Sequence, residues 1–512
     1  MAGVGFATVA LALNPLSAGA AERPAAKPVA PPASATSAGP GASTDGHTAT
    51  PAQRARMALE APLAQAAVRI RTAAQAKPSG FAGVALDDGK VQVYWKGSVP
   101  AEMQAVLDQE SRKVPVRVRT AAWSAQEMDR AAAALNRKVR IGGESTVSSI
   151  GWSVRGTGLR ATLHARAGTT PRLPDVGVPV TVVREPAPRT GAVKPSTDSP
   201  RTPARQNWAT AKDGLSAASV TWPDPSRQDD TTPAWAGAHL INSNATGGNG
   251  GWQTRLADST VADADTKWHC TSGFPVRHDS GAELMVVPSS CARPAHALVD
   301  PSGDAVNDTA GTSSGWYAPS SGVSLVKPKG GAEPFVYDGD AWTQNGWQIA
   351  AWESPIAGQQ VCVSGAERGT LCDAEIGDEV GTRTASISNS QGGGDQAFGL
   401  TSLDTSYHSG PVRPNNKPYT LKDGSPCFGF DFLEDFDADY CSPYPLGPGD
   451  MGAVVYTIPA NGPQTGVLVK GVLVNQHQAP DASPYGYDFV GIDKIAASFT
   501  GITALTVDND QK

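Results

Sequence analysis

The sequence predicts a mainly β protein whose strands follow a small α+β region. From about residue 233 onward, short β-branched, apolar runs alternate with Gly, Pro, Asn and Asp, a pattern typical of an all-β barrel or sandwich. The chain holds 55 glycines and 41 prolines, which indicates many turns and linkers rather than long helices. With 512 residues, 40% of them hydrophobic, it is long enough for two or three domains with their own cores.

The first 20 residues are similar to a secretory signal peptide. A short apolar stretch ends in Ala18-Gly19-Ala20, a small-x-small pattern that predicts cleavage after Ala20. No Lys or Arg precedes the apolar stretch, so a disordered alanine-rich terminus remains the alternative. Residues 21–52, rich in Ala, Pro, Ser and Thr, are expected to be a disordered lead-in. No later segment reaches the roughly 20 apolar residues of a membrane span, so we expect a soluble, secreted, extracellular protein.

Residues 53–185 are predicted to form the small α+β region. Residues 53–77 carry Ala, Leu and Arg at helical spacing. Ser124 is the expected N-cap of a later helix, because its hydroxyl can accept a hydrogen bond from a free backbone N–H. The expected strands are 91–95, 114–118, 159–165 and 178–183, and the further expected helices are 101–111 and 124–135.

Residues 186–232 are rich in Pro, Ser, Thr and charged side chains, so we expect a linker that is open to proteolysis. Residues 233–512 are predicted to form the β domain. Its expected strands are 283–287, 323–326, 348–351, 360–363, 453–458 and 466–474.

Charge and cysteine usage narrow the class of protein. A net charge of −7 and a pI near 5.7, with no basic stripe, argue against a nucleic-acid partner. The even number of cysteines in a chain expected to be exported predicts disulfides, and sequential pairing is favoured because each neighbouring pair closes a compact loop. No pair shows C-x-x-C spacing and the nearby histidines follow no ligand pattern, so neither a metal nor a cofactor is predicted. The six cysteines are Cys270, Cys291, Cys362, Cys372, Cys427 and Cys441.

Four motifs follow one another in a recognisable order. They are WAGAHLI at 235–241, WHCTSGFPVR at 268–277, VCVSG at 361–365 followed by Cys372, and GDMGAVVY at 449–456. Together they resemble secreted actinobacterial chymotrypsin/trypsin-like serine proteases, the streptogrisin-like group. The resemblance covers about residues 233–507 and implies a two-β-barrel chymotrypsin-like domain. Residues 80–185 are similar to the pro-region that precedes such domains.

The resemblance also implies a Ser-His-Asp triad, and this chain departs from it at all three positions. Ser290, beside Cys291, stands where the family has histidine, Gly322 where it has aspartate, and Met451 where it has the nucleophilic serine. A serine hydroxyl is no base near neutral pH, glycine has no carboxylate to orient a base, and a thioether cannot form an acyl-enzyme.

Other parts of the implied site would remain. Backbone N–H groups of Gly449 and Met451 would still form an oxyanion-hole-like site, because backbone donors survive side-chain substitution. Pro445 stands where the floor of the specificity pocket is expected, which gives no support for a preference for Lys or Arg.

The sequence therefore favours a pseudoprotease with a cleft that binds a peptide or another secreted protein. Two alternatives stay open: an active serine endopeptidase that uses residues not matched here, and a non-catalytic extracellular scaffold. Weaker candidates for chemistry are three histidines, a G-x-S-x-G match in a loop and an acidic run, which are more simply read as surface or structural features. They are His278, His296, His477, residues 311–315 and residues 431–439.

Overall fold

The computed structural model describes the chain in a series of segments. The described residues are 48–76, 80–139, 147–165, 173–186, 227, 230, 233–242, 268–289, 291, 298–299, 307–308, 317–318, 322–328, 330–339, 343–366, 369–385, 396–405, 446, 450–459, 466–477 and 486–507. The signal-peptide-like segment lies outside these residues, as do most of the expected lead-in and most of the expected linker.

The N-terminal region, residues 48–186, mixes helices and strands as predicted. Its elements are α1 (Pro51–Ala76), β1 (Phe81–Asp87), β2 (Lys90–Trp95), α2 (Ala101–Ser111), β3 (Val116–Thr120), α3 (Ala125–Val139), β4 (Val147–Ser153), β5 (Leu159–Ala165) and β6 (Val180–Pro186). β1, β2 and β3 form one sheet, with β2 antiparallel to β1 and parallel to β3. The β1–β2 turn has positive φ at Asp88 and Gly89, as a two-residue hairpin loop of the Asp-Gly type requires.

Reciprocal capping fixes where two of the helices begin. Thr50 Oγ1 accepts a hydrogen bond from Gln53 N at 3.3 Å, and Gln53 Oε1 accepts one from Thr50 N at 2.8 Å. With Pro51 at the first helical position, this box starts α1 two residues earlier than the helical spacing predicts. The expected cap of α3 is confirmed, because Ser124 and Glu127 bond each other in the same reciprocal way.

In the described residues between 227 and 507, which we call the β region, nearly all helices and strands are strands, which confirms the mainly β prediction. Its strands are β7 (Ala234–Ala236), β8 (His239–Asn242), β9 (Trp268–Thr271), β10 (Pro275–His278), β11 (Glu283–Pro288), β12 (Leu298–Val299), β13 (Asn307–Asp308), β14 (Tyr317–Ala318), β15 (Val323–Pro328), β16 (Ala332–Tyr337), β17 (Gly346–Trp352), β18 (Gln360–Gly365), β19 (Gly369–Ala385), β20 (Gln396–Thr405), β21 (Val454–Thr457), β22 (Val467–His477), β23 (Gly486–Gly491) and β24 (Ile502–Ala504). One short helix, α5 (Ile492–Ser498), follows β23. Each strand predicted in this region overlaps an observed strand.

The strands of the β region lie in two sheets that share a hydrophobic core. One sheet runs in the order β24-β10-β11-β15-β13-β12-β8-β9, and the other contains β19-β18-β21-β22-β17-β16-β7 along its path. Buried side chains from both sheets meet in a single cluster, for example Val276 and Val286 of the first with Val454 and Val472 of the second. The two sheets therefore stabilise each other through apolar contact.

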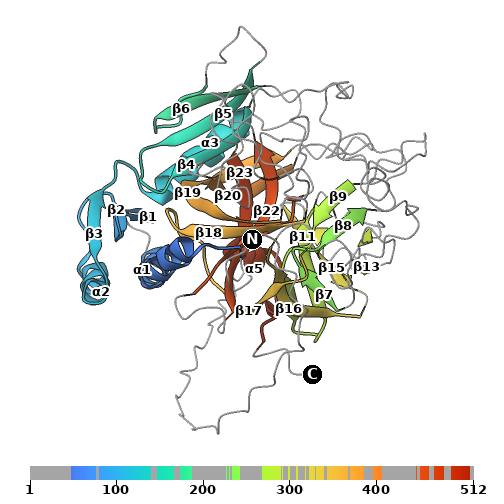
Figure 1. The fold of residues 1–512 in the computed structure, drawn as a ribbon. Helices are drawn as coiled ribbons and strands as arrows, with labels where there is room; N and C mark the ends of the chain where they lie inside the picture. Colours follow the sequence, from blue (N-terminus) through green and yellow to red (C-terminus); the bar gives the residue numbers. More distant parts are fainter. Residues whose placement is uncertain are drawn as a thin grey trace, which may run out of the picture. The chain divides into compact units, whose positions relative to one another are not determined.

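The second sheet also takes in three strands of the N-terminal region. β4 pairs antiparallel with β19, and β5 and β6 continue the sheet beyond it, side by side in Figure 1. Gly151 and Gly381 face each other across this pairing, where a Cβ on Gly381 would overlap the backbone of Gly151. Arg155 Nε donates to Asp378 Oδ2 at 2.8 Å and Arg160 bonds Glu379 at 3.0 Å. Backbone pairing and ion pairs thus join the two regions, which the sequence predicted as separate domains.

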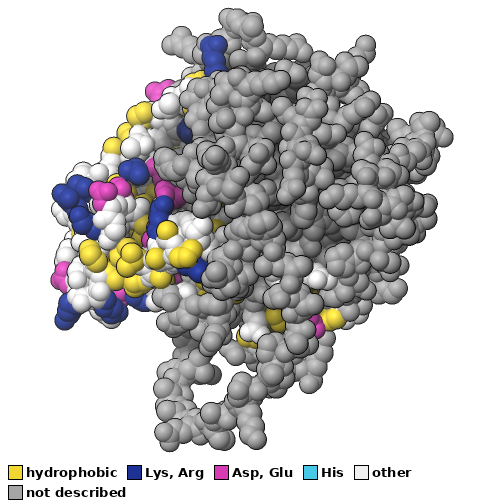
Figure 2. Space-filling view, in the orientation of Figure 1, with side chains coloured by type: hydrophobic (Ala, Val, Ile, Leu, Met, Phe, Trp, Pro, Cys, Tyr) yellow, Lys and Arg dark blue, Asp and Glu magenta, His cyan; other side chains and the backbone are white. Residues whose placement is uncertain are grey.

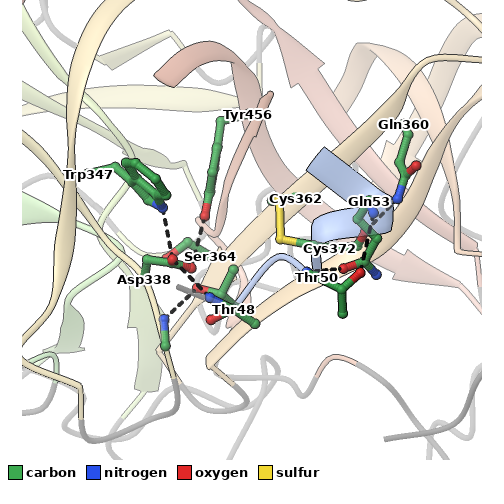
Figure 3. Close-up of a disulfide and its surroundings, with 12 residues drawn as sticks. Thr48, Thr50, Gln53, Asp338, Trp347, Gln360, Cys362, Ser364, Cys372 and Tyr456 are labelled. Atoms are coloured by element: carbon green, nitrogen blue, oxygen red, sulfur yellow. Dashed lines mark hydrogen bonds between the residues drawn. A yellow bond between two sulfur atoms is a disulfide. The ribbon is translucent and has the colours of Figure 1, made fainter. Parts of the chain in front are cut away.

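The start of α1 is inserted into the β region at a buried carboxylate. Asp338 Oδ2 accepts hydrogen bonds from the backbone N–H of Thr48 at 3.1 Å and from Trp347 Nε1 at 2.8 Å. Tyr456 donates to Asp338 Oδ1 at 3.3 Å, and Figure 3 shows these donors directed at the carboxylate. Burial, with Asp338 adding to it, raises the pKa of Tyr456 well above its usual value. The Asp338 carboxylate therefore links the N-terminal segment to two strands of the β region.

Apolar and charged contacts extend this insertion along α1. Ala49 and Met57 are 0% and 2% exposed and belong to the same core cluster as the two β sheets. Arg56 bonds Glu375 at 2.7 Å, and Glu60 Oε2 accepts the backbone N–H of Gln360 at 2.7 Å. The first turns of α1 are thus packed as part of the β region's core.

The far end of α1 lies near a buried lysine of β22. Arg71 donates to Pro355 O at 2.9 Å and to Asp493 Oδ2 at 3.1 Å. Lys470 is fully buried and forms an ion pair with Glu353. Burial lowers the pKa of Lys470, and the Glu353 carboxylate opposes that shift. Ion pairs thus join α1 to the β region near both ends of the helix.

Basic side chains gather on the face of the N-terminal region that carries α2 and β3. Figure 2 shows Lys and Arg atoms over the part of this face that carries α2 and β3. Four of the exposed side chains on and just before the edge strand β3 are basic: Arg112, Lys113, Arg117 and Arg119. Charges along an edge strand hinder pairing with another chain, so this edge is protected against aggregation.

A methionine and a leucine on α1 test whether the helix belongs to the β region's core. Met57→Ala removes a buried side chain and should lower the free energy of unfolding by about 2–5 kcal/mol. Leu59→Ala, at a position 75% exposed on the same helix, should cost under about 0.5 kcal/mol. Urea denaturation of both variants measures the difference, and equal losses would contradict the inserted position of α1.

The capping carboxylate of α3 predicts a pH dependence of stability. The hydrogen bond from Lys96, followed by that from the backbone of Ser124, lowers the pKa of Glu127 from 4.5 to about 2. A folded-state pKa below the unfolded one stabilises the protein above the unfolded pKa, and this contribution is lost as pH falls through the folded pKa. The stability difference between wild type and Glu127→Gln should therefore be full near neutral pH and shrink between 4.5 and about 2. Denaturation across pH measures it, and a difference that stays constant would contradict the assignment.

Candidate functional site

Two disulfides frame the candidate site. Cys270 near the end of β9 bonds Cys291, and Cys362 on β18 bonds Cys372 on β19. Both are the sequential pairs that loop size favours. Cys427 and Cys441 lie outside the described residues, so their pairing stays a prediction.

The loop Asp450–Gly452, which we call the junction loop, connects the two β sheets. Met451 O accepts the backbone N–H of Thr271 on β9 at 2.7 Å, and Gly452 N donates to Leu473 O on β22 at 2.9 Å. The Met451 side chain is only 1% exposed, so a thioether is buried where the resemblance implies a reactive hydroxyl.

Gly452 makes the contact between the loop and the first sheet possible. Its φ is +104°, which L side chains rarely adopt, and a Cβ there would overlap the carbonyl oxygen of Thr271. The same Cβ would lie 3.1 Å from Pro288 Cδ at the end of β11. The junction loop therefore touches the end of the strand that leads to residue 290.

Gly322, which directly precedes β15, also contacts the chain at the end of β11. Its carbonyl oxygen accepts the backbone N–H of Ser289 at 2.9 Å. Ser289 and Ser324 are buried, and their hydroxyl oxygens lie 3.0 Å apart in a hydrogen bond. Ser290 itself lies outside the described residues, but Ser289 and Cys291 on either side of it are placed. The described surroundings of all three predicted triad positions thus meet at the end of β11.

Apart from the buried Asp450 carboxylate, the described polar groups at this junction are backbone amides and hydroxyls that bond within the protein. Thr271 Oγ1 accepts the N–H of Ala366 at 2.9 Å, and the Ser289–Ser324 pair is satisfied internally. His278 on β10 lies near a surface turn, where its Nδ1 bonds Ser280 Oγ at 2.8 Å. In the described ranges no three His, Cys, Asp or Glu side chains are grouped to hold a metal.

Several other predicted residues lie outside the described part of the chain. They are Pro445, Gly449, His296, residues 311–315 and residues 431–439, and the side chain of His477 is likewise not described. Leu446, next to Pro445, is buried, and its backbone N–H and carbonyl both bond Tyr487 OH, at 3.1 and 3.2 Å. None of the described helices is long and apolar enough to cross a membrane.

Sequence reasoning missed two residues that the structure buries beside the site. Arg227 and Asp230 are 0% and 2% exposed, although both fall within the predicted linker. Their neighbours in the sequence are rich in Pro, Ser and Thr, and a domain boundary drawn from composition cannot reveal that single charged residues are buried. The only available signal was the Arg-x-x-Asp pair immediately before the first β-like motif.

Comparisons with solved structures find similarity between this chain and several serine proteases. The sequence matches no protein-family model and no curated protein. Among solved structures it is similar to protease A of Thermobifida fusca, with 18% identity over 47% of this chain and 92% of the protease (TM-score 0.29). It is also similar to a chymotrypsin of Cellulomonas bogoriensis (17% identity, 46% and 91%, TM-score 0.28) and to a glutamic-acid-specific serine protease (12% identity, 53% and 100%, TM-score 0.32).

The close contact at Gly452 gives a test of the junction geometry. Gly452→Ala should lower the free energy of unfolding by about 3 kcal/mol or more, because backbone strain adds to overlap with Thr271. Gly89→Ala is the matched control: its φ is also positive, at +66°, but nothing lies within 4 Å, so it should cost about 1–2 kcal/mol. Thermal and urea unfolding measure both, and a loss at Gly452 no larger than at Gly89 would argue against this packing.

Proposed function

We propose that the chain is an exported, catalytically inactive homologue of chymotrypsin-like serine proteases, a pseudoprotease whose remaining cleft holds a peptide or another secreted protein. The proposal combines the two-barrel resemblance of the sequence motifs with the two-sheet β region and its sequential disulfides. Hydrolysis of a peptide bond by this route needs a nucleophile, a base and a group that orients the base. The substitutions at 290, 322 and 451 remove all three.

The proposal rests mainly on one observation: the described residues at or next to the three substituted positions lie close together at the end of β11. Gly452 packs near Pro288, and Gly322 O accepts the N–H of Ser289. These contacts support the assignment of Gly322, which rests in the sequence on a short strand match alone. They also support loss of activity, because the side chain at 451 is a buried methionine.

A chain without a nucleophile would not process itself, so the N-terminal region should stay attached. The β4–β19 pairing and the burial of Ala49 and Met57 in the β region's core support a permanent role for that region. Backbone donors at 449 and 451 would still bind a carbonyl oxygen, which favours a site that grips a peptide without cutting it.

A fluorophosphonate probe and back-substitution test the proposal together. The purified chain should not be labelled by the probe, because Met451 stands where the resemblance implies the nucleophilic serine. The triple variant Ser290→His, Gly322→Asp and Met451→Ser should gain peptidase activity and labelling at the hydroxyl introduced at position 451. The gain will be partial, because Gly322 has φ of +79° and a side chain there costs about 1–2 kcal/mol.

The double variant Ser290→His and Gly322→Asp is the control, and it should remain unlabelled because it lacks the nucleophile. Labelling of the unmodified chain at one serine, mapped by mass spectrometry, would refute inactivity and favour the alternative of an active hydrolase. A binding screen with immobilised peptides then separates a peptide-binding cleft from a plain scaffold.

A further inference from the structure

Arg227 is a fully buried arginine whose guanidinium is held by the β region. Its Nη1 donates to Ser364 Oγ at 2.9 Å and to Gly365 O at 2.5 Å, both at the end of β18. Its Nη2 donates to Thr370 Oγ1 at 3.1 Å, and its backbone N–H bonds Thr343 O at 3.0 Å. An arginine in a solvated linker would not make this set of buried hydrogen bonds, so Arg227 belongs to the folded β region.

Asp230, between Arg227 and β7 in the sequence, is also held by the β region. Its Oδ1 accepts a hydrogen bond from Tyr337 OH at 2.8 Å, and its Oδ2 accepts the backbone N–H of Trp235 at 3.0 Å. The Arg227 guanidinium also lies 5.8 Å from the centre of the Tyr337 ring. The backbone carbonyl of Arg227 accepts the N–H of His239 at 2.8 Å, which joins Arg227 to β8.

Arg227 and the junction loop meet at Gly365. The carbonyl of Gly365 accepts the guanidinium, while its Cα faces the Asp450 carboxylate, which a Cβ at 365 would overlap. Asp450 is 0% exposed. Opposite charges buried on either side of one glycine are screened little by water, so any attraction between them is stronger than it would be at the surface.

A second path joins the end of β18 to the loop. Ala366, next to Gly365, donates its N–H to Thr271 Oγ1 at 2.9 Å, and Thr271 N donates to Met451 O at 2.7 Å. Gly237 approaches from the other side: its carbonyl accepts Arg227 Nη1 at 3.3 Å and its N–H bonds Ser272 O at 2.8 Å.

From these contacts we propose that Arg227, which like Asp230 lies against Tyr337, is a positioning residue for the junction loop Asp450–Gly452. The guanidinium orients the end of β18 and supplies the positive charge beside Asp450, so the backbone of Met451 and Gly452 depends on a side chain that precedes the first strand of the β region. Any cleavage that separates the two regions and preserves the loop must leave Arg227 on the β region.

Methionine methyl groups provide the test, because the six methionines are spread over both regions. The full-length chain carrying 13C-methyl methionine is compared with Arg227→Gln. We expect the Met451 methyl resonance to shift and broaden, and the Gly452 amide to exchange with solvent about tenfold faster. The Met103 and Met128 resonances, from the N-terminal region, should stay in place. Arg227→Lys, which keeps the charge but not the fork of donors, should restore part of the wild-type pattern.

Arg160→Gln is the matched control, since it removes an arginine whose bond is to the partly exposed Glu379, and it should leave Met451 and Gly452 unchanged. Unchanged Met451 and Gly452 signals in Arg227→Gln would overturn the proposal. If that variant does not fold, Thr370→Val, which removes one bond of the guanidinium, decides by the same two readouts. Neither readout uses catalysis, so the result is independent of the fluorophosphonate experiment.

Discussion

The backbone contact between Thr271 and the junction loop is the interaction on which the arrangement of the β region depends. Thr271 ends β9 of one sheet, and Met451 and Gly452 lead into β21 of the other. The contact brings Gly452 against a carbonyl oxygen at a distance that only glycine tolerates. It also sets the loop beside the end of β11, and through Ser289 beside Gly322. Shifting it would move the loop away from both the first sheet and the end of β11, because the same glycine makes both contacts.

The N-terminal region stabilises the β region in three physically different ways. It supplies core side chains through Ala49 and Met57, backbone pairing through β4, and charge pairing through Arg56 and Arg71. Exposed ion pairs contribute little each, so burial and backbone pairing carry most of the stabilisation. A region held mainly by buried apolar surface is expected to stay bound when salt concentration rises, unlike one held by surface charge.

Local features of the fold were predictable from the sequence, and long-range ones were not. The helix at 101–111 and the strand at 159–165 match the prediction to the residue, because apolar spacing and turn residues mark them locally. The two described disulfides, Cys270–Cys291 and Cys362–Cys372, could likewise be anticipated from loop size. Arg227 could not, since its burial depends on Ser364, 137 residues away. At the candidate site, motifs indicated which residues were substituted, but only the register of β11 against β15 brings Gly322 to Ser289.

The bond between Thr48 and Asp338 has a consequence for how the chain folds. It joins residues 290 apart in sequence, and the Arg155–Asp378 bond beside the β4–β19 pairing joins residues 223 apart. Closing such loops costs chain entropy before any contact compensates for it, so folding through these pairings is slow. During synthesis, the N-terminal region emerges long before its partner strands exist. Until those strands are made, the apolar side chains of its first helix, including Met57, and Ala49 just before it stay exposed, and such surface makes the nascent chain prone to aggregation.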